Sequence, residues 1–80
     1  MTSLSSDVRA QVVQALHVAV NRPVEIGGNT QIVQDLGLDS LAVMNLILAI
    51  EDTFDISIPL NRVAEIVTVD DLVQAVESLI

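Results

Sequence analysis

The sequence predicts an all-α fold, a small four-helix bundle made of three main helices and one short helix. Apolar residues recur at the 3.6-residue spacing of amphipathic helices in three separate segments. Capping residues and prolines bound these segments. Strand signals are weak, because the alternating run Ile56-Ser57-Ile58 is too short to count. With 80 residues in all, we expect residues 1–80 to form one domain with a marginal core.

The first helix is expected to start after Ser5 or Ser6, which are favourable N-cap residues with Asp7 in the first turn behind them. Pro23 ends it, because proline disfavours helix in the residue before it. One apolar face recurs at helical spacing, formed by Val8, Val12, Leu16, Ala19 and Val20.

A long connection follows over residues 21–38 and contains Gly27, Gly28 and Gly37. A loop of this length in so small a domain is usually functional or packed on its own apolar residues. The apolar residues that we expect to supply this packing are Ile26, Ile32, Val33 and Leu36.

The second helix is predicted over residues 40–54 and has two apolar faces. The core-facing stripe consists of Val43, Leu46, Ile47, Ile50 and Phe54. About 140° around the helix lies a second stripe, Leu41, Met44 and Leu48, which we call the outer stripe. A bundle of this size has no second core, so we predict a partner-docking surface rimmed by Glu51 and Asp52. The alternative is that the connection 21–38 folds over this stripe.

Two further signals place the last helices. Pro59 marks the start of a short third helix over residues 60–66. Thr68, with Asp71 three residues later, predicts a capping box that starts the last helix, with Asp in place of the usual Glu. The apolar residues of that helix are Leu72, Val73, Val76, Leu79 and Ile80.

Charge is distributed unevenly along the chain. Residues 1–34 sum to zero, whereas residues 35–80 carry nine acids against Arg62, so the whole net charge of −8 sits there. This field repels nucleic acid and anionic membranes, and it steers partners with basic patches toward the protein. The alternative is that acidity only keeps an apolar small protein soluble.

Several signals are missing from the sequence. Without cysteine there is no disulfide and no thiolate metal site, and we expect no metal. The N-terminus lacks a secretory signal, and the longest nearly apolar stretch, residues 41–50, is too short to span a bilayer. We therefore expect a soluble, cytoplasmic protein without membrane insertion, and a monomer.

Ser40 is the candidate functional residue. It follows Asp39 at a predicted helix start, with no catalytic base nearby in the sequence and no Gly-x-Ser-x-Gly motif. The only histidine, His17, lies beside the apolar face of the first helix. We therefore expect no catalytic residue and a serine that other enzymes modify; a phosphate esterified to it would lie where a helix N-terminus favours an anion. The alternative is that Ser40 merely helps to start the helix.

Leu36-Gly37-Leu38-Asp39-Ser40-Leu41, followed by Ala49-Ile50-Glu51-Asp52-Thr53-Phe54, resembles the acyl carrier protein family. The run Ile56-Ser57-Ile58-Pro59 and the Thr68-Val69-Asp70-Asp71-Leu72 start of the last helix resemble it too, so that the resemblance covers nearly the whole chain.

The resemblance implies a free-standing, non-enzymatic carrier of fatty-acid or related biosynthesis. The resemblance further implies that a phosphopantetheinyl transferase attaches 4′-phosphopantetheine from coenzyme A to Ser40. In that reading, Asp39 and Leu41 are the flanking motif. Acyl groups would then be bound to the thiol of this arm as thioesters and be presented to acyl-loading and acyl-transferring enzymes. The aliphatic interior is compatible with sheltering an acyl chain.

The sequence departs from the family's pattern at Ala42, Asn45 and Thr53, where acids are common. We therefore expect a specialised carrier that relies more on the outer stripe than on charge. Three alternatives remain open: an aminoacyl or peptidyl carrier loaded by an adenylating enzyme, an unmodified helical docking module, and a serine hydrolase.

Overall fold

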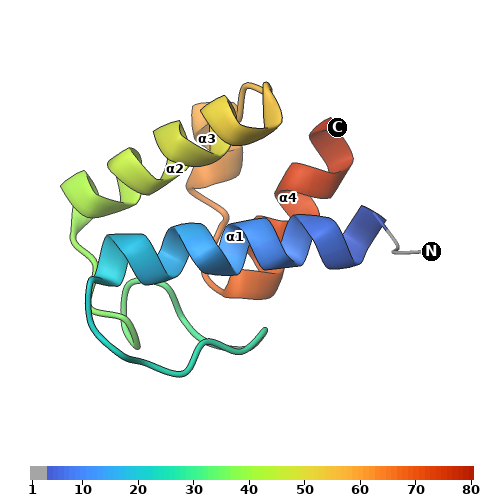
Figure 1. Ribbon diagram of the computed structural model, residues 1–80. Coiled ribbons are helices and arrows are strands. Elements are labelled where there is room, and N and C mark those ends of the chain that lie inside the picture. Colours follow the sequence, from blue (N-terminus) through green and yellow to red (C-terminus); the bar gives the residue numbers. More distant parts are fainter. Residues whose placement is uncertain (1–3) are drawn as a thin grey trace.

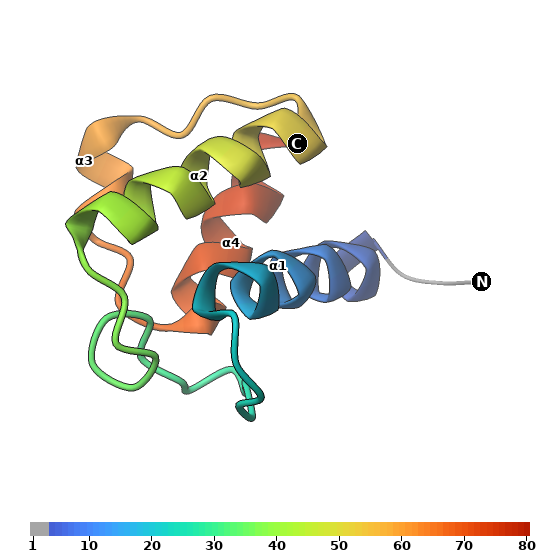
Figure 2. The same ribbon diagram turned by 60° about the vertical axis from the view of Figure 1, so that its left-hand side comes forward.

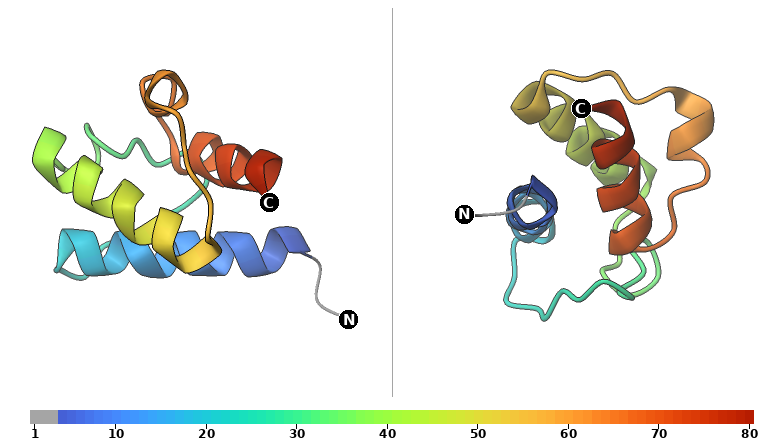
Figure 3. Two further views of the ribbon diagram at one scale, coloured as in Figure 1. Left: turned by 90° about the horizontal axis from the view of Figure 1, so that it is seen from above. Right: turned by 90° about the vertical axis from the view of Figure 1, so that its right-hand side faces the viewer.

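The computed structural model describes residues 4–80, and within them it is all-helical, as predicted (Figure 1). The four helices are α1 (Leu4–Val20), α2 (Ser40–Phe54), α3 (Leu60–Val63) and α4 (Val69–Leu79). Helix α1 packs against both α2 and α4. The short helix α3 lies on the far side of α2 and α4 from α1 (Figure 3). No helix of the described part is long and apolar enough to cross a membrane.

The core lies between the three long helices, and each contributes the face that its spacing predicts. In α1, Val8, Val12 and Leu16 are fully buried. The central residues of the core-facing stripe of α2 are buried, while Val43 and Phe54 are half-buried and pack against them. In α4 the buried apolar residues are Val69, Leu72, Val73, Ala75 and Val76.

Two helix boundaries differ from the predictions. Helix α1 begins at Leu4, so Ser5 and Ser6 lie inside it; serine is only mildly unfavourable within a helix. Helix α3 ends at Val63 rather than near residue 66. The N–H groups of Glu65 and Ile66 donate to carbonyls three residues back, at 3.1 Å each, so the chain continues as a tighter turn.

The capping box predicted for the last helix is present. Thr68 Oγ1 accepts from the N–H of Asp71 at 3.1 Å, and Asp71 Oδ2 accepts from the N–H of Thr68 at 3.0 Å. The same carboxylate oxygen accepts from the N–H of Val67 at 3.0 Å. Asp71 thus fixes both the start of α4 and the end of the segment that precedes it.

Stability is expected to depend on the protonation of Asp71. The N–H groups of Thr68 and Val67 lower the pKa of its carboxyl below the ordinary value of 3.8. Because the folded-state pKa is depressed, this stabilisation is fully present above pH 3.8 and is lost as the pH falls through the folded-state pKa. Asp71→Asn should flatten the acid limb of the unfolding free energy, measured by urea denaturation at several pH values. Glu65→Gln removes one exposed charge as a control, and an equal flattening there would contradict the assignment.

The connection between α1 and α2 packs on its own apolar residues, as predicted, with one exception. Ile32 and Leu36 are buried, and Ile26 is half-buried against the core. Leu38 is buried as well. Val33, in contrast, has 56% of its surface exposed, because it lies at the edge of a surface groove rather than in the core.

The connection is tied to the start of α4, beside which it runs in Figure 2. Ile32 N–H donates to Val67 O at 2.9 Å, and Val69 N–H donates to Thr30 O at 3.0 Å. Nearby, the Asp70 carboxylate lies so close to Gly28 that a Cβ there would meet its oxygens at 2.6 Å. This long loop is therefore an ordered part of the bundle.

Candidate functional site

The start of α2 is capped by Asp39 and not by Ser40. Asp39 has extended backbone angles, and its Oδ1 accepts from the N–H of Ala42 at 2.8 Å. Ser40 is the first residue of the helix, and its side chain is exposed. Within the described residues, no hydrogen bond involves the Ser40 hydroxyl. The helix-starting role considered for Ser40 therefore belongs to its neighbour.

The turn before α2 holds Asp39 and Ser40 at the surface. Asp35 Oδ2 accepts from the N–H of Gln31 at 2.8 Å, which closes the turn on itself. Gly37 has a positive φ of 69°, a conformation that favours glycine. Buried Leu36 and Leu38 anchor the turn on either side of Gly37. The chain thus leaves the core at Leu38 and presents Asp39 and Ser40 to solvent.

Ser40 lies at the edge of a mostly apolar groove of about 450 Å³ between α2, α3 and the connection. Besides Ser40, the lining residues are Val33, Leu38, Asp39, Val43, Met44, Val63 and Ile66. A narrow crevice of about 20 Å³ lies next to it and is walled only by aliphatic side chains, including Ile47 and Leu72. Groove and crevice share Val33, Val43, Val63 and Ile66, so the lining common to both is aliphatic.

The outer stripe is exposed. Leu41, Met44 and Leu48 have 70%, 41% and 57% of their surfaces accessible. The alternative that the connection covers them is wrong, because its buried residues face the core instead. Leu60 of α3, which no pattern in the sequence marks as a surface residue, is 72% exposed.

The two acids predicted to rim the outer stripe differ in their surroundings. Asp52 is exposed. Glu51 is half-buried, and its Oε2 accepts from the N–H of Ile58 at 2.7 Å. The carboxylate of Glu51 is thus turned toward the chain that follows α2, a contact that no local pattern in the sequence indicates.

Among residues 4–80, no histidine lines the groove beside Ser40, and the carboxylate of Asp39 accepts from the N–H of Ala42. His17 is exposed on α1 and lines a shallow hollow together with Arg9, Ala10, Val13 and Gln14. Ser40 does not line this hollow but the groove described above. In the described part of the chain, no group of three His, Asp or Glu side chains is placed to hold a metal ion. Fold and site together define a small helical domain that presents a serine beside an exposed apolar stripe.

Comparisons with known proteins identify the family. The family model described as "Phosphopantetheine attachment site" matches residues 6–76. The "Acyl carrier protein" of Sulfurovum sp. is 39% identical over 77 residues, covering 96% of this chain and 99% of the relative. The "Probable acyl carrier protein" of Caulobacter vibrioides is 48% identical over 60 residues, covering 75% of this chain and 70% of the relative.

A solved structure from Mycobacterium tuberculosis, described as a candidate acyl carrier protein, is similar in fold. It superimposes with a TM-score of 0.85 at 31% sequence identity and covers 89% of this chain and 96% of its own. The chain therefore belongs to the acyl carrier protein family, as the sequence motifs indicated.

Proposed function

We propose that residues 1–80 are a single acyl-carrier domain that carries acyl groups as thioesters on a 4′-phosphopantetheine arm attached to Ser40. The observation that carries this proposal is the position of Ser40: exposed, first in α2, and at the edge of an apolar groove. The chain has no cysteine, so the thiol that the arm supplies is needed for any thioester chemistry. In this proposal the protein acts in the cytoplasm and is not itself an enzyme.

The residues around Ser40 suit its modification by a separate enzyme. Its hydroxyl attacks the phosphorus of coenzyme A next to the pantetheine; a serine phosphodiester bond forms and adenosine 3′,5′-bisphosphate leaves. In this proposal the transferase supplies the base that takes the hydroxyl proton, because the carboxylate of neighbouring Asp39 is engaged with the N–H of Ala42. Asp39 keeps α2 intact up to Ser40 by capping the N–H of Ala42. Leu41, exposed beside it, supplies apolar contact area for the transferase.

The groove and crevice fit an acyl chain. Their shared lining is aliphatic, so a methylene chain that enters them leaves water without burying a polar group. The crevice of about 20 Å³ is much smaller than the groove of about 450 Å³. Its walls must therefore separate before a chain passes from the groove into the core.

In the docking surface that we propose, the outer stripe supplies the apolar centre and Asp52 an acidic edge for basic patches on acyl-handling enzymes. Glu51, predicted for the same rim, has its carboxylate engaged with Ile58 N–H. Ala42, Asn45 and Thr53 add no charge to α2. We therefore propose that electrostatic steering is weak and that the carrier serves a dedicated pathway.

This proposal predicts a weak salt dependence. Raising the ionic strength should change the KM of an acyl-loading partner enzyme less than about threefold, because apolar contacts are not screened. The double variant Asn45→Glu and Thr53→Glu, at two exposed positions, should steepen the salt dependence and speed loading by general fatty-acid enzymes. If the unaltered chain is already loaded and elongated by those enzymes as fast as a housekeeping carrier, the specialised role is wrong.

The experiment that tests the carrier function is intact-protein mass spectrometry. The protein is weighed before and after incubation with coenzyme A, Mg²⁺ and a broad-specificity phosphopantetheinyl transferase. A gain of one phosphopantetheine, placed on Ser40 and not on Ser57 or Ser78 by peptide fragmentation, supports the proposal. Lack of modification by this enzyme and by transferases from the chain's own source would favour an unmodified docking module.

A further inference from the structure

Met44 carries the only sulfur atom among residues 4–80. The sequence has no cysteine, and its other methionine, Met1, lies outside the described residues. Oxidation of a thioether to a sulfoxide is a common chemical change of proteins, and it converts a flexible apolar side chain into a polar one. Met44 is 41% exposed, so a dissolved oxidant has access to its side chain without any change in the fold.

Met44 lies where the outer stripe of α2 meets the groove beside Ser40. It is the central residue of that stripe, between Leu41 and Leu48, and it also lines the groove. Ser40 lies four residues before it, and side chains four apart lie on the same face of a helix. A long helical side chain also leans back toward the N-terminus of its helix. The thioether of Met44 therefore lies over the turn that carries Ser40.

The surroundings of Met44 offer little to a polar oxygen. Apart from Asp39 and Ser40, the other side chains that line the groove are aliphatic. A carboxylate only accepts hydrogen bonds, and Asp39 Oδ1 already accepts from the N–H of Ala42. An oxygen added to Met44 would therefore be solvated by water or by the Ser40 hydroxyl. In either case it opposes a partner that buries the outer stripe, because burying a polar group without a hydrogen bond is unfavourable.

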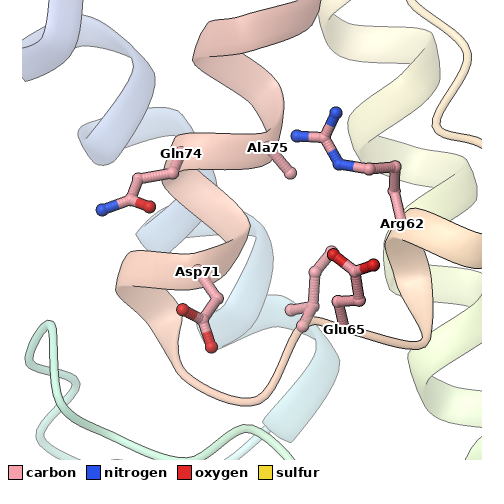
Figure 4. A pocket seen from close by; sticks show the side chains of 6 residues that line it. Arg62, Glu65, Asp71, Gln74 and Ala75 are labelled. Atoms are coloured by element: carbon pink, nitrogen blue, oxygen red, sulfur yellow. The ribbon is translucent and has the colours of Figure 1, made fainter.

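A second hollow provides the contrast, because its lining is polar. This hollow of about 140 Å³ lies between α4 and the segment 60–66 (Figure 4). Arg62 and Glu65 line it from that segment, and Asp71 and Gln74 line it from α4. Gln74 is exposed, as Met44 is. A thioether at position 74 would thus be open to solvent as well, but its oxidation would add one polar group among several.

We propose that Met44 is a reversible oxidation site and that its sulfoxide weakens docking at the surface beside Ser40. The thioether sulfur attacks one oxygen of hydrogen peroxide: an S–O bond forms, the O–O bond breaks, and the peroxide is reduced to water. A methionine sulfoxide reductase with a dithiol reverses the step; the oxygen leaves as water and the dithiol becomes a disulfide. That the affected partners are acyl-handling enzymes rests on the proposed function, whereas the reactivity of Met44 does not.

The test compares three placements of one thioether. The unaltered chain has it at position 44. Met44→Leu combined with Ile47→Met moves it into the core, where Ile47 is 4% exposed, and Met44→Leu combined with Gln74→Met moves it into the polar hollow. Met44→Leu alone retains only Met1 and measures the background. Each protein is treated with hydrogen peroxide in the absence of coenzyme A, and peptide mass spectrometry follows the oxidation of each methionine.

The thioethers at positions 44 and 74 should be oxidised about tenfold faster than the one at position 47, because reactivity follows exposure. A methionine sulfoxide reductase with dithiothreitol should restore Met44, and the urea midpoint of the oxidised chain should match that of the reduced chain. Oxidation at position 47 as fast as at position 44, or unfolding of the oxidised chain, would overturn the proposal.

Docking is then measured as the kcat/KM of the phosphopantetheinyl transferase, with each protein compared with itself before and after oxidation. The unaltered chain should lose about tenfold or more, as for a residue in the centre of an interface, and the position-74 variant should stay within about twofold. An oxidised chain loaded as fast as the reduced one, or an equal loss in the position-74 variant, would overturn the proposal. If the reduced chain is not loaded either, the proposed function fails, and the oxidation rates still decide whether Met44 is the reactive site.

Discussion

Ser40→Ala is expected to abolish phosphopantetheine attachment, and with it all acyl transfer, while leaving the fold intact. The Ser40 side chain is exposed, and Asp39 caps α2. An exposed serine without such a role contributes little, so the free energy of unfolding should change by less than about 0.5 kcal/mol. Intact mass measures the first effect and urea denaturation the second.

Asp39→Ala is the matched control at the neighbouring position. Loss of the bond to Ala42 N–H should lower the free energy of unfolding by about 1 kcal/mol, as for other N-cap residues. The two substitutions should thus differ in stability: Ser40→Ala leaves the free energy of unfolding nearly unchanged, and Asp39→Ala lowers it. A destabilisation by Ser40→Ala as large as that by Asp39→Ala would assign Ser40 a structural role that the geometry does not show.

Leu41→Arg and Met44→Glu are expected to slow the reactions of partner enzymes with this carrier strongly. Both should have only a weak effect on the free energy of unfolding. Both side chains are exposed, so their contact area is available to a partner. Losing an apolar contact in the centre of an interface costs about 2 kcal/mol or more, and transfer rates at low carrier concentration should fall by tenfold or more. The rates are measured as kcat/KM of a loading or transfer enzyme.

The core-facing stripe provides the contrast for this prediction. Ile47 is buried, so Ile47→Ala should lower the free energy of unfolding by about 2–5 kcal/mol. Leu48→Ala, one residue further along the same helix, should change it by less than about 0.5 kcal/mol. A large loss of stability from Leu41→Arg or Met44→Glu would place the outer stripe in the core and remove the docking surface.

The parts of the fold that depend on local signals could be predicted from the sequence. The bounds of α2 and the capping box at Thr68 follow from residues a few positions apart, and the structure confirms them. The two faces of α2 also follow from its periodicity. As predicted, the core-facing stripe packs in the core and the outer stripe is exposed.

The rest depends on residues that meet across the fold. The exposure of Val33 is set by where its turn meets α2 and α3. The contact of Glu51 with Ile58 requires the chain to turn back after α2, which periodicity does not describe. The groove beside Ser40 combines three separate segments, so no single one of them reveals it.

The tie between the connection and the start of α4 has a consequence for how the protein is made. Residues 30–32 pair with residues 67–69, so the chain between them, including α2, forms a large closed loop. Contacts so distant in sequence form late, because the entropy of loop closure must be overcome first. Translation delivers Ser40 well before α4, and Leu72 of α4 is a wall of the crevice. During synthesis, Ser40 is therefore in place before the crevice has all of its walls.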